Sequence, residues 1–250
     1  MGGIGIFVDK RLRIGDVVQF TSLPENYFRA TGEKLIDINK TWCFDFNPYV
    51  VRDVEPKKIV ELWNFPKKYE WPRPRLNGMY QSNAEIWASL LGVSVILNRP
   101  RLYRFENFPF DRREKILFHS RGCAHGLMPK AIVDHVRLKY GKNLFHIGLQ
   151  DEPNYGIPRI ETKTLWDLVR VISTSRMLIG PDSGPGWIAA CYPDIIVKKV
   201  RVKEMPGPSK LKDWVPLEIG NHHSHWDDRL FQMYNASEAD QGYTWSYKKL

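Results

Sequence analysis

Short apolar runs alternate along this chain with longer segments whose apolar residues recur at helical spacing. We expect strands where apolar residues, many of them β-branched or aromatic, run together between turn or charged residues. The predicted strands cover residues 4–8, 35–39, 49–53, 115–119, 143–149, 176–180 and 195–199. Each is short, and each is followed by polar or turn-forming residues.

The segments between these strands carry helix start signals. A helix is predicted over residues 15–27, opening at Asp16, with Pro24 near its end. Capping-box patterns at residues 82–85 and 164–167 predict two more helices, and Pro129 is well placed to begin another. Alternation of strand and helix predicts an α/β fold with parallel sheets and crossover helices.

Two stretches interrupt this alternation. Residues 99–114 are rich in proline and charge, and we interpret them as the connection between an N-terminal domain (1–105) and a C-terminal domain (106–250). Residues 54–80 hold four prolines and six basic residues. Two interpretations of that segment stay open: a solvent-exposed surface loop, or one side of a binding site for an anionic acceptor.

Composition narrows the class of protein. The chain has 43% hydrophobic residues, enough for a packed core, and carries 37 basic and 28 acidic residues, a net charge of +9. The positive excess is spread over both halves and suits anionic partners such as nucleotides, acidic glycans or lipids. No nucleic-acid-binding signature is present, so nucleic acid is not expected as a partner.

Targeting and cysteine patterns point to the cytoplasm. The N-terminus carries charges from Asp9 onward and does not read as a secretory signal, and no apolar run is long enough to span a membrane. The three cysteines, Cys43, Cys123 and Cys191, are far apart and are expected to be reduced and buried. Peripheral contact with the inner face of an acidic membrane stays open.

The strongest candidate for chemistry is the segment Gly180-Pro-Asp182-Ser183-Gly184-Pro-Gly186. It follows a predicted strand and precedes an alanine-rich helix that Asp182 or Ser183 can cap. Free backbone N–H groups at such a helix start favour an anion. An ordinary capped turn is the alternative.

A second candidate is Asp16, just past the end of the first predicted strand. In open α/β sheets ligands lie at the carboxyl edge, and a carboxylate there could take a proton from a substrate hydroxyl. The alternative is that Asp16 only complements the helix dipole.

These two loops resemble glycosyltransferase family 9, the ADP-heptose:lipopolysaccharide heptosyltransferase group. Gly15-Asp16 through Pro24 is similar to that family's G-D-x-x-x-x-x-P segment, with the proline two positions late. Gly180 through Ala190 is similar to its G-x-D-[ST]-G-x-x-H-x-A-A motif, with Trp187 at the histidine position. The resemblance implies a GT-B-like architecture, in which two Rossmann-like parallel-sheet domains face each other across a cleft.

The resemblance also implies roles for individual residues. It implies an inverting, metal-independent sugar transfer with Asp16 as general base, Asp182 holding donor hydroxyls, and Ser183 and Gly184 receiving the donor phosphate. Further donor contacts are expected from the loop after the first strand of the second domain. The remaining candidates are Ser120 and Arg121 for the diphosphate, and Gly15, Trp187 and His125 as donor or acceptor contacts.

The expected donor is a nucleotide-sugar and the expected acceptor an anionic glycan or glycolipid, as in lipopolysaccharide or polysaccharide biosynthesis, with no cofactor and no metal. The histidines at 222, 223 and 225 are interpreted as part of a polar loop. Two alternatives remain: a degenerate nucleotide-sugar or anion-binding module of the same fold, and a basic α/β protein associated with nucleic acid.

Overall fold

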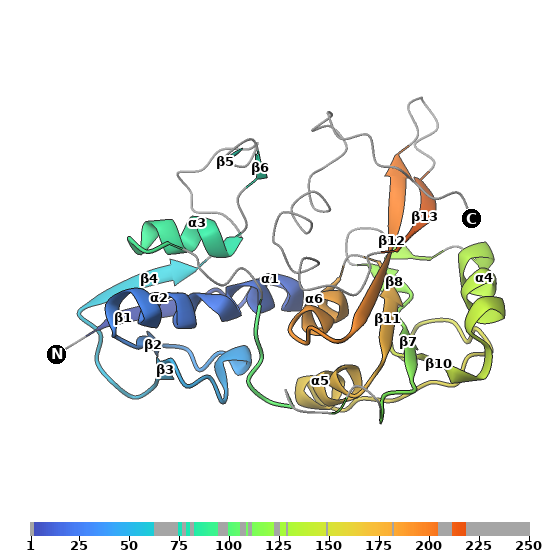
Figure 1. Cartoon of the computed structure of the whole chain (residues 1–250), viewed down its shortest axis with the longest axis horizontal. Coiled ribbons are helices and arrows are strands. Elements are labelled where there is room, and N and C mark those ends of the chain that lie inside the picture. The colour runs from blue at the N-terminus through green and yellow to red at the C-terminus, as the bar shows by residue number, and fades with distance from the viewer. Residues whose placement is uncertain are drawn as a thin grey trace. The chain divides into compact units, whose positions relative to one another are not determined.

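The computed structural model of the chain describes residues 3–62, 75–76, 79–80, 83–94, 100–105, 109, 112–122, 126–128, 130–148, 150–181, 183–204 and 212–218 (Figure 1). The described residues fall into two compact units, unit 1 up to residue 105 and unit 2 from residue 109. Each unit is an α/β sandwich built around its own parallel sheet.

Unit 1 begins with a buried strand, as its continuous apolar run predicts. Its elements are β1 (Ile4–Val8), α1 (Ile14–Gln19), the 3₁₀ turn η1 (Phe20–Ser22), α2 (Leu23–Thr31), β2 (Leu35–Asp37), η2 (Trp42–Phe44), β3 (Val50–Val51), β4 (Lys58–Leu62), β5 (Arg75–Leu76), β6 (Met79–Tyr80) and α3 (Asn83–Leu90). Strands β3, β2, β1 and β4 form a parallel sheet in that order, while β5 and β6 make a small hairpin.

Two predictions for unit 1 were wrong in detail. The single helix expected over residues 15–27 is divided into α1, η1 and α2, and α2 continues to Thr31. Pro24 is the second residue of α2, where its missing N–H leaves no bond unmade, so it helps to begin this helix instead of ending one. The segment 54–80, read as irregular, contains β4, which pairs with β1 from Ile4–Lys58 to Val8–Leu62.

Unit 2 carries the second parallel sheet. Its elements are β7 (Ile116–Phe118), β8 (Arg121–Gly122), β9 (Gly126–Leu127), α4 (Lys130–Tyr140), η4 (Gly141–Asn143), β10 (Leu144–His146), α5 (Leu165–Ser173), β11 (Met177–Gly180), α6 (Gly184–Ala190), β12 (Ile196–Glu204) and β13 (Lys212–Glu218). The strand order is β10-β7-β11-β12-β13, parallel except for β13. Both sheet orders are those of Rossmann-like folds.

Helices cover both faces of the unit 2 sheet, with α4 on one side and α5 and α6 together on the other (Figure 1). The face under α4 is apolar: Val133 and Val136 of the helix pack on Phe118, Leu144 and Ile179 of three strands. The capping box predicted for α5 is confirmed, because Thr164 Oγ1 accepts the Asp167 N–H at 3.0 Å and the Asp167 carboxylate accepts the Thr164 N–H at 3.0 Å.

Candidate functional site

The strand order of unit 2 reverses direction at β7. The chain passes from β7 to β10 on one side and then returns to β11 on the other. In such sheets the crossover helices diverge at this point, and ligands bind outside the carboxyl ends of the strands. The loops that follow β7, β10 and β11 meet at this edge, and they include both segments of unit 2 singled out from the sequence.

The loops after β7 and β11 are joined by a direct side-chain contact. Ser183 Oγ lies 3.1 Å from His119 Nδ1 and 3.2 Å from the Pro181 carbonyl oxygen. Burial lowers the pKa of His119 to about 4, against the opposing charge of Glu152, so this imidazole is neutral near pH 7. Gly180 permits the close approach, since a Cβ there would lie 2.9 Å from the His119 carbonyl oxygen.

Behind this contact lies a buried polar cluster, made of Ser120, His146 and Glu152. Ser120 is 0%, His146 2% and Glu152 4% exposed. The Ser120 hydroxyl donates to Glu152 Oε2, and His146 Nε2 lies 3.2 Å from that oxygen and 3.3 Å from Ser120 Oγ. The cluster therefore ties the ends of β7 and β10 to the loop that follows β10.

This cluster does not have the geometry of a nucleophilic triad. In a Ser-His-acid triad the serine contacts one ring nitrogen and the carboxylate orients the other. Here Ser120 and Glu152 both approach Nε2 of His146, and Ser120 has no exposed surface. The arrangement holds the loop in place, and the Ser120 hydroxyl proton is directed at Glu152.

An exposed ion pair also connects the loop after β7 to the loop after β10. Arg121 Nη1 lies 2.8 Å from Asp151 Oδ2, so Ser120 and Arg121 pair with Glu152 and Asp151 respectively. The hydrogen bond and charge of Asp151 raise the pKa of Arg121. The guanidinium predicted to meet a donor phosphate thus has a carboxylate partner.

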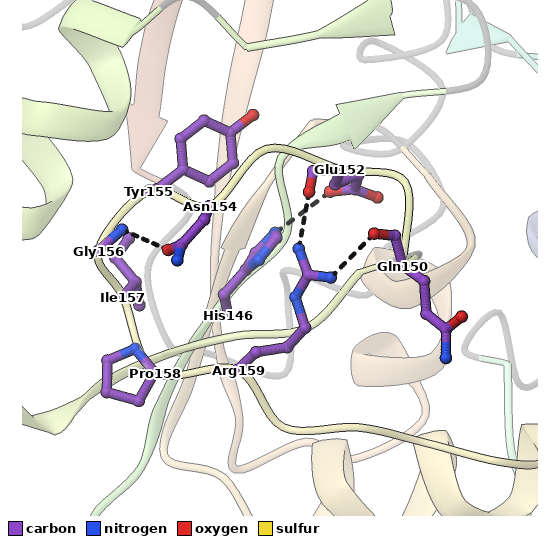
Figure 2. Close-up of a pocket in the computed structure, with 9 residues that line it drawn as sticks. All are labelled: His146, Gln150, Glu152, Asn154, Tyr155, Gly156, Ile157, Pro158 and Arg159. Atoms are coloured by element: carbon purple, nitrogen blue, oxygen red, sulfur yellow. Dashed lines mark hydrogen bonds and ion pairs between the residues drawn. The ribbon is translucent and has the colours of Figure 1, made fainter.

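The loop after β10 lines a partly open cavity of about 580 Å³ (Figure 2). Its described lining residues are His146, Gln150, Glu152, Asn154, Tyr155, Gly156, Ile157, Pro158 and Arg159. Arg159 donates from Nη2 to the Glu152 carbonyl oxygen at 3.0 Å and from Nη1 to the Gln150 carbonyl oxygen at 3.4 Å. A cavity of this volume is in the range of small-molecule sites.

Asp16 lies in the first turn of α1, shortly after the carboxyl end of β1. Its carboxylate accepts the Arg13 N–H at 3.3 Å, so the dipole-complementing role named as the alternative is present. The side chain is half-buried, and the preceding Gly15 is buried within the helix. The sheet order of unit 1 changes direction at β1, which puts Asp16 near the ligand edge of that sheet as predicted.

The other predicted site residues have different outcomes. Asp182 and His125 lie outside the described residues. Ser183, one of the two residues expected to cap α6, stands at its N-cap position, but its side chain makes no cap bond; Gly184 is the first helical residue. The Ser183 hydroxyl is directed to His119 and Pro181 instead. Trp187 is 5% exposed, so its ring presents no open stacking face.

Sequence reasoning did not select Glu152, Arg159 or His146 as site residues; His146 is buried, with Nε2 3.2 Å from Glu152 Oε2. One signal was available for Glu152, since acidic and polar residues at 150–152 directly follow a predicted strand. Nothing local marks Arg159, because its contacts depend on how the loop folds back.

Comparisons with solved structures place this fold. Escherichia coli heptosyltransferase WaaC, solved with ADP-2-deoxy-2-fluoro heptose, matches with a TM-score of 0.53 at 12% identity, covering 83% of this chain and 91% of that one. The chain has the GT-B-like fold of the heptosyltransferases. TibC, an iron-containing dodecameric glycosyltransferase from enterotoxigenic E. coli, matches with a TM-score of 0.59 at 13% identity, covering 95% and 74% of the two chains.

A glycosyltransferase of family 9 from Veillonella parvula matches with a TM-score of 0.55 at 13% identity, covering 78% of this chain and 80% of that one. No protein-family model and no curated protein matches the sequence. Within the described residues, no group of three or more His, Cys, Asp or Glu side chains is arranged to hold a metal ion. The same residues include no helix with the length and apolar character needed to cross a bilayer.

Proposed function

We propose that this protein is a glycosyltransferase that uses a nucleotide-activated sugar. The observation that carries the proposal is that heptosyltransferase structures share its two-unit fold over most of their length, including one solved with an ADP-sugar analogue. The joining of the β7 and β11 loops by the Ser183–His119 contact supports it, because both loops were selected from the sequence as donor contacts.

In the proposed reaction the acceptor hydroxyl attacks the anomeric carbon of the donor and the nucleoside diphosphate leaves, with inversion and without a metal. Asp16 takes the proton of that hydroxyl. Asp182 holds hydroxyls of the donor sugar, while Arg121 and the backbone N–H groups at Ser183 and Gly184 offset charge on the departing diphosphate. To contact the diphosphate, the Arg121 guanidinium must share its hydrogen bonds between Asp151 and the donor, or break its ion pair with Asp151.

The acceptor we propose is an anionic glycan or glycolipid, and the support is the net charge of +9. No cofactor is assigned. Heptosyl transfer is the specific form of the reaction suggested by the neighbours, and the donor base and sugar are what the first experiment identifies.

That experiment is a thermal-shift titration of the full chain with ADP, GDP, UDP and CDP and with their sugars. Ligand at about 100 times its Kd should stabilise the protein by roughly 2.7 kcal/mol. Ser183→Ala should weaken the responding nucleotide about tenfold, a loss of ~1.4 kcal/mol, whereas Ser89→Ala, on an exposed face of α3, should leave its Kd unchanged. Absence of a response to every nucleotide would remove the proposal.

A further inference from the structure

The cavity after β10 contains a basic side chain with an unusual set of partners. Arg159 donates to two main-chain carbonyl oxygens, those of Gln150 and Glu152, and it is the one arginine or lysine among the nine lining residues in Figure 2. A guanidinium has five N–H donors, and its bonds to the described residues use two of them. Carbonyl oxygens are neutral, so they position the group without cancelling its charge.

The carboxylates near Arg159 are used by other groups. The Glu152 side chain is 0% exposed and its carboxylate is taken by Ser120 and His146. Asp151 is paired with Arg121 at 2.8 Å. Among the described residues no carboxylate oxygen forms an ion pair with Arg159, in contrast to Arg121 at the same edge.

The backbone of Arg159 is also tied to the end of β10. It forms a parallel bridge with His146, in which the His146 N–H donates to Pro158 at 2.8 Å and the Ile160 N–H donates to His146 at 2.9 Å. The loop that it clamps is held from beneath by the Glu152 cluster. A guanidinium held this way loses little side-chain entropy when it binds, which favours affinity.

We propose that Arg159 is a phosphate-binding residue of this cavity and holds a phosphate of the nucleotide donor. The inference rests on the proposed function for the identity of the donor and adds a residue that neither matched loop contains. A planar guanidinium with free N–H groups matches phosphate oxygens in a bidentate manner. Tyr155 and Asn154 of the same lining supply an aromatic edge and an amide for the remainder of the ligand.

The test compares Arg159→Gln with Arg176→Gln by isothermal titration. Arg176 is exposed at the amino end of β11, so its variant removes the same charge at the opposite edge of the same sheet. The ligands are the responding nucleoside diphosphate, its uncharged nucleoside and inorganic pyrophosphate. Arg159→Gln should weaken the diphosphate and pyrophosphate about tenfold to a hundredfold, in line with a charge-assisted bond, and leave the nucleoside unchanged.

Arg159→Lys distinguishes the effect of the positive charge from the effect of holding the loop. Lysine keeps the charge but cannot bond the Gln150 and Glu152 carbonyl oxygens together. It should retain more diphosphate affinity than the glutamine variant. Equal weakening of nucleoside and diphosphate by Arg159→Gln would mean that Arg159 only shapes the loop, and would overturn the inference.

The same titrations distinguish failure of the proposed function from failure of the inference about Arg159. If wild-type protein binds no nucleotide but binds pyrophosphate through Arg159, the donor assignment fails and the phosphate site stands. If wild-type protein binds neither nucleotide nor pyrophosphate, both fail. Binding of the diphosphate with the same Kd in wild type and Arg159→Gln overturns the inference alone.

Discussion

Ser183 Oγ lies 3.1 Å from His119 Nδ1, and this contact joins two loops that are 64 residues apart in the chain. Both loops leave the carboxyl ends of adjacent parallel strands, β7 and β11. A ligand bound at this edge would therefore contact a pair of loops whose relative position is already set by a hydrogen bond.

The desolvated imidazole of His119 should make stability depend on pH. Its folded pKa of about 4 lies below the reference value of 6.5, so the unfolded chain binds more protons in that interval. The free energy of unfolding should fall as the pH falls from 6.5 to 4, by roughly 1.4 kcal/mol per pKa unit. Urea unfolding of His119→Asn across this range should show a shallower pH slope, while His135→Asn on α4 keeps the wild-type slope. Identical slopes in all three proteins would show that His119 is accessible to protons.

Asp16→Asn tests the general base without removing its capping contact. The amide oxygen can still accept the Arg13 N–H, so the melting temperature should change little. Turnover, followed as nucleoside diphosphate release with a deacylated lipopolysaccharide core as acceptor, should fall roughly 10²- to 10⁴-fold with an unchanged donor Kd. Asp53→Asn, at an exposed position, is the matched control. Full turnover by Asp16→Asn would assign the carboxylate to capping only.

Glu25 should stabilise unit 1 through a buried ionic network. Its carboxylate receives bonds from Arg29 at 2.8 Å, Tyr103 at 2.7 Å and Arg101 at 3.2 Å. Burial opposes ionisation of Glu25, but these bonds and charges outweigh it and lower its pKa below 4.5. Its contribution is therefore present above pH 4.5 and is lost as the pH falls through the folded pKa.

Glu25→Gln should reduce the free energy of unfolding by about 2 kcal/mol at pH 7, because two half-exposed arginines lose their charged partner. Thermal unfolding at pH 7 and at pH 3 measures this. The difference from wild type should shrink at the lower pH, because protonation of the Glu25 carboxylate removes the same charge that the glutamine variant lacks. Glu33→Gln, exposed just beyond α2, should have no effect at either pH. A deficit of the same size at both pH values would argue against an ionic contribution.

Local pattern was sufficient for much of the fold. Residues 4–8 and 176–180 are continuous apolar runs, and both form strands near the expected bounds, β1 and β11, because buried parallel strands have no polar face. β4 escaped prediction because Lys58 and Glu61 interrupt its apolar pattern, as the exposed positions of the outermost strand among the described residues allow. Pro24 indicated a helix boundary in the sequence, but the sequence did not show that a helix begins there and does not end there.

The sequence by itself determined which loops are candidates for the functional site, since Asp16, Ser120 and Ser183 each follow an apolar strand. Tertiary structure decided what those side chains do. Ser120 is directed to Glu152, 32 residues away, and Trp187 is enclosed, because both outcomes depend on contacts between segments that local periodicity does not encode. Arg159 faces a cavity only because the loop after β10 returns to pair beside His146. Strand position follows from short-range hydrophobicity, whereas the environment of a polar side chain follows from which distant segments fold against it.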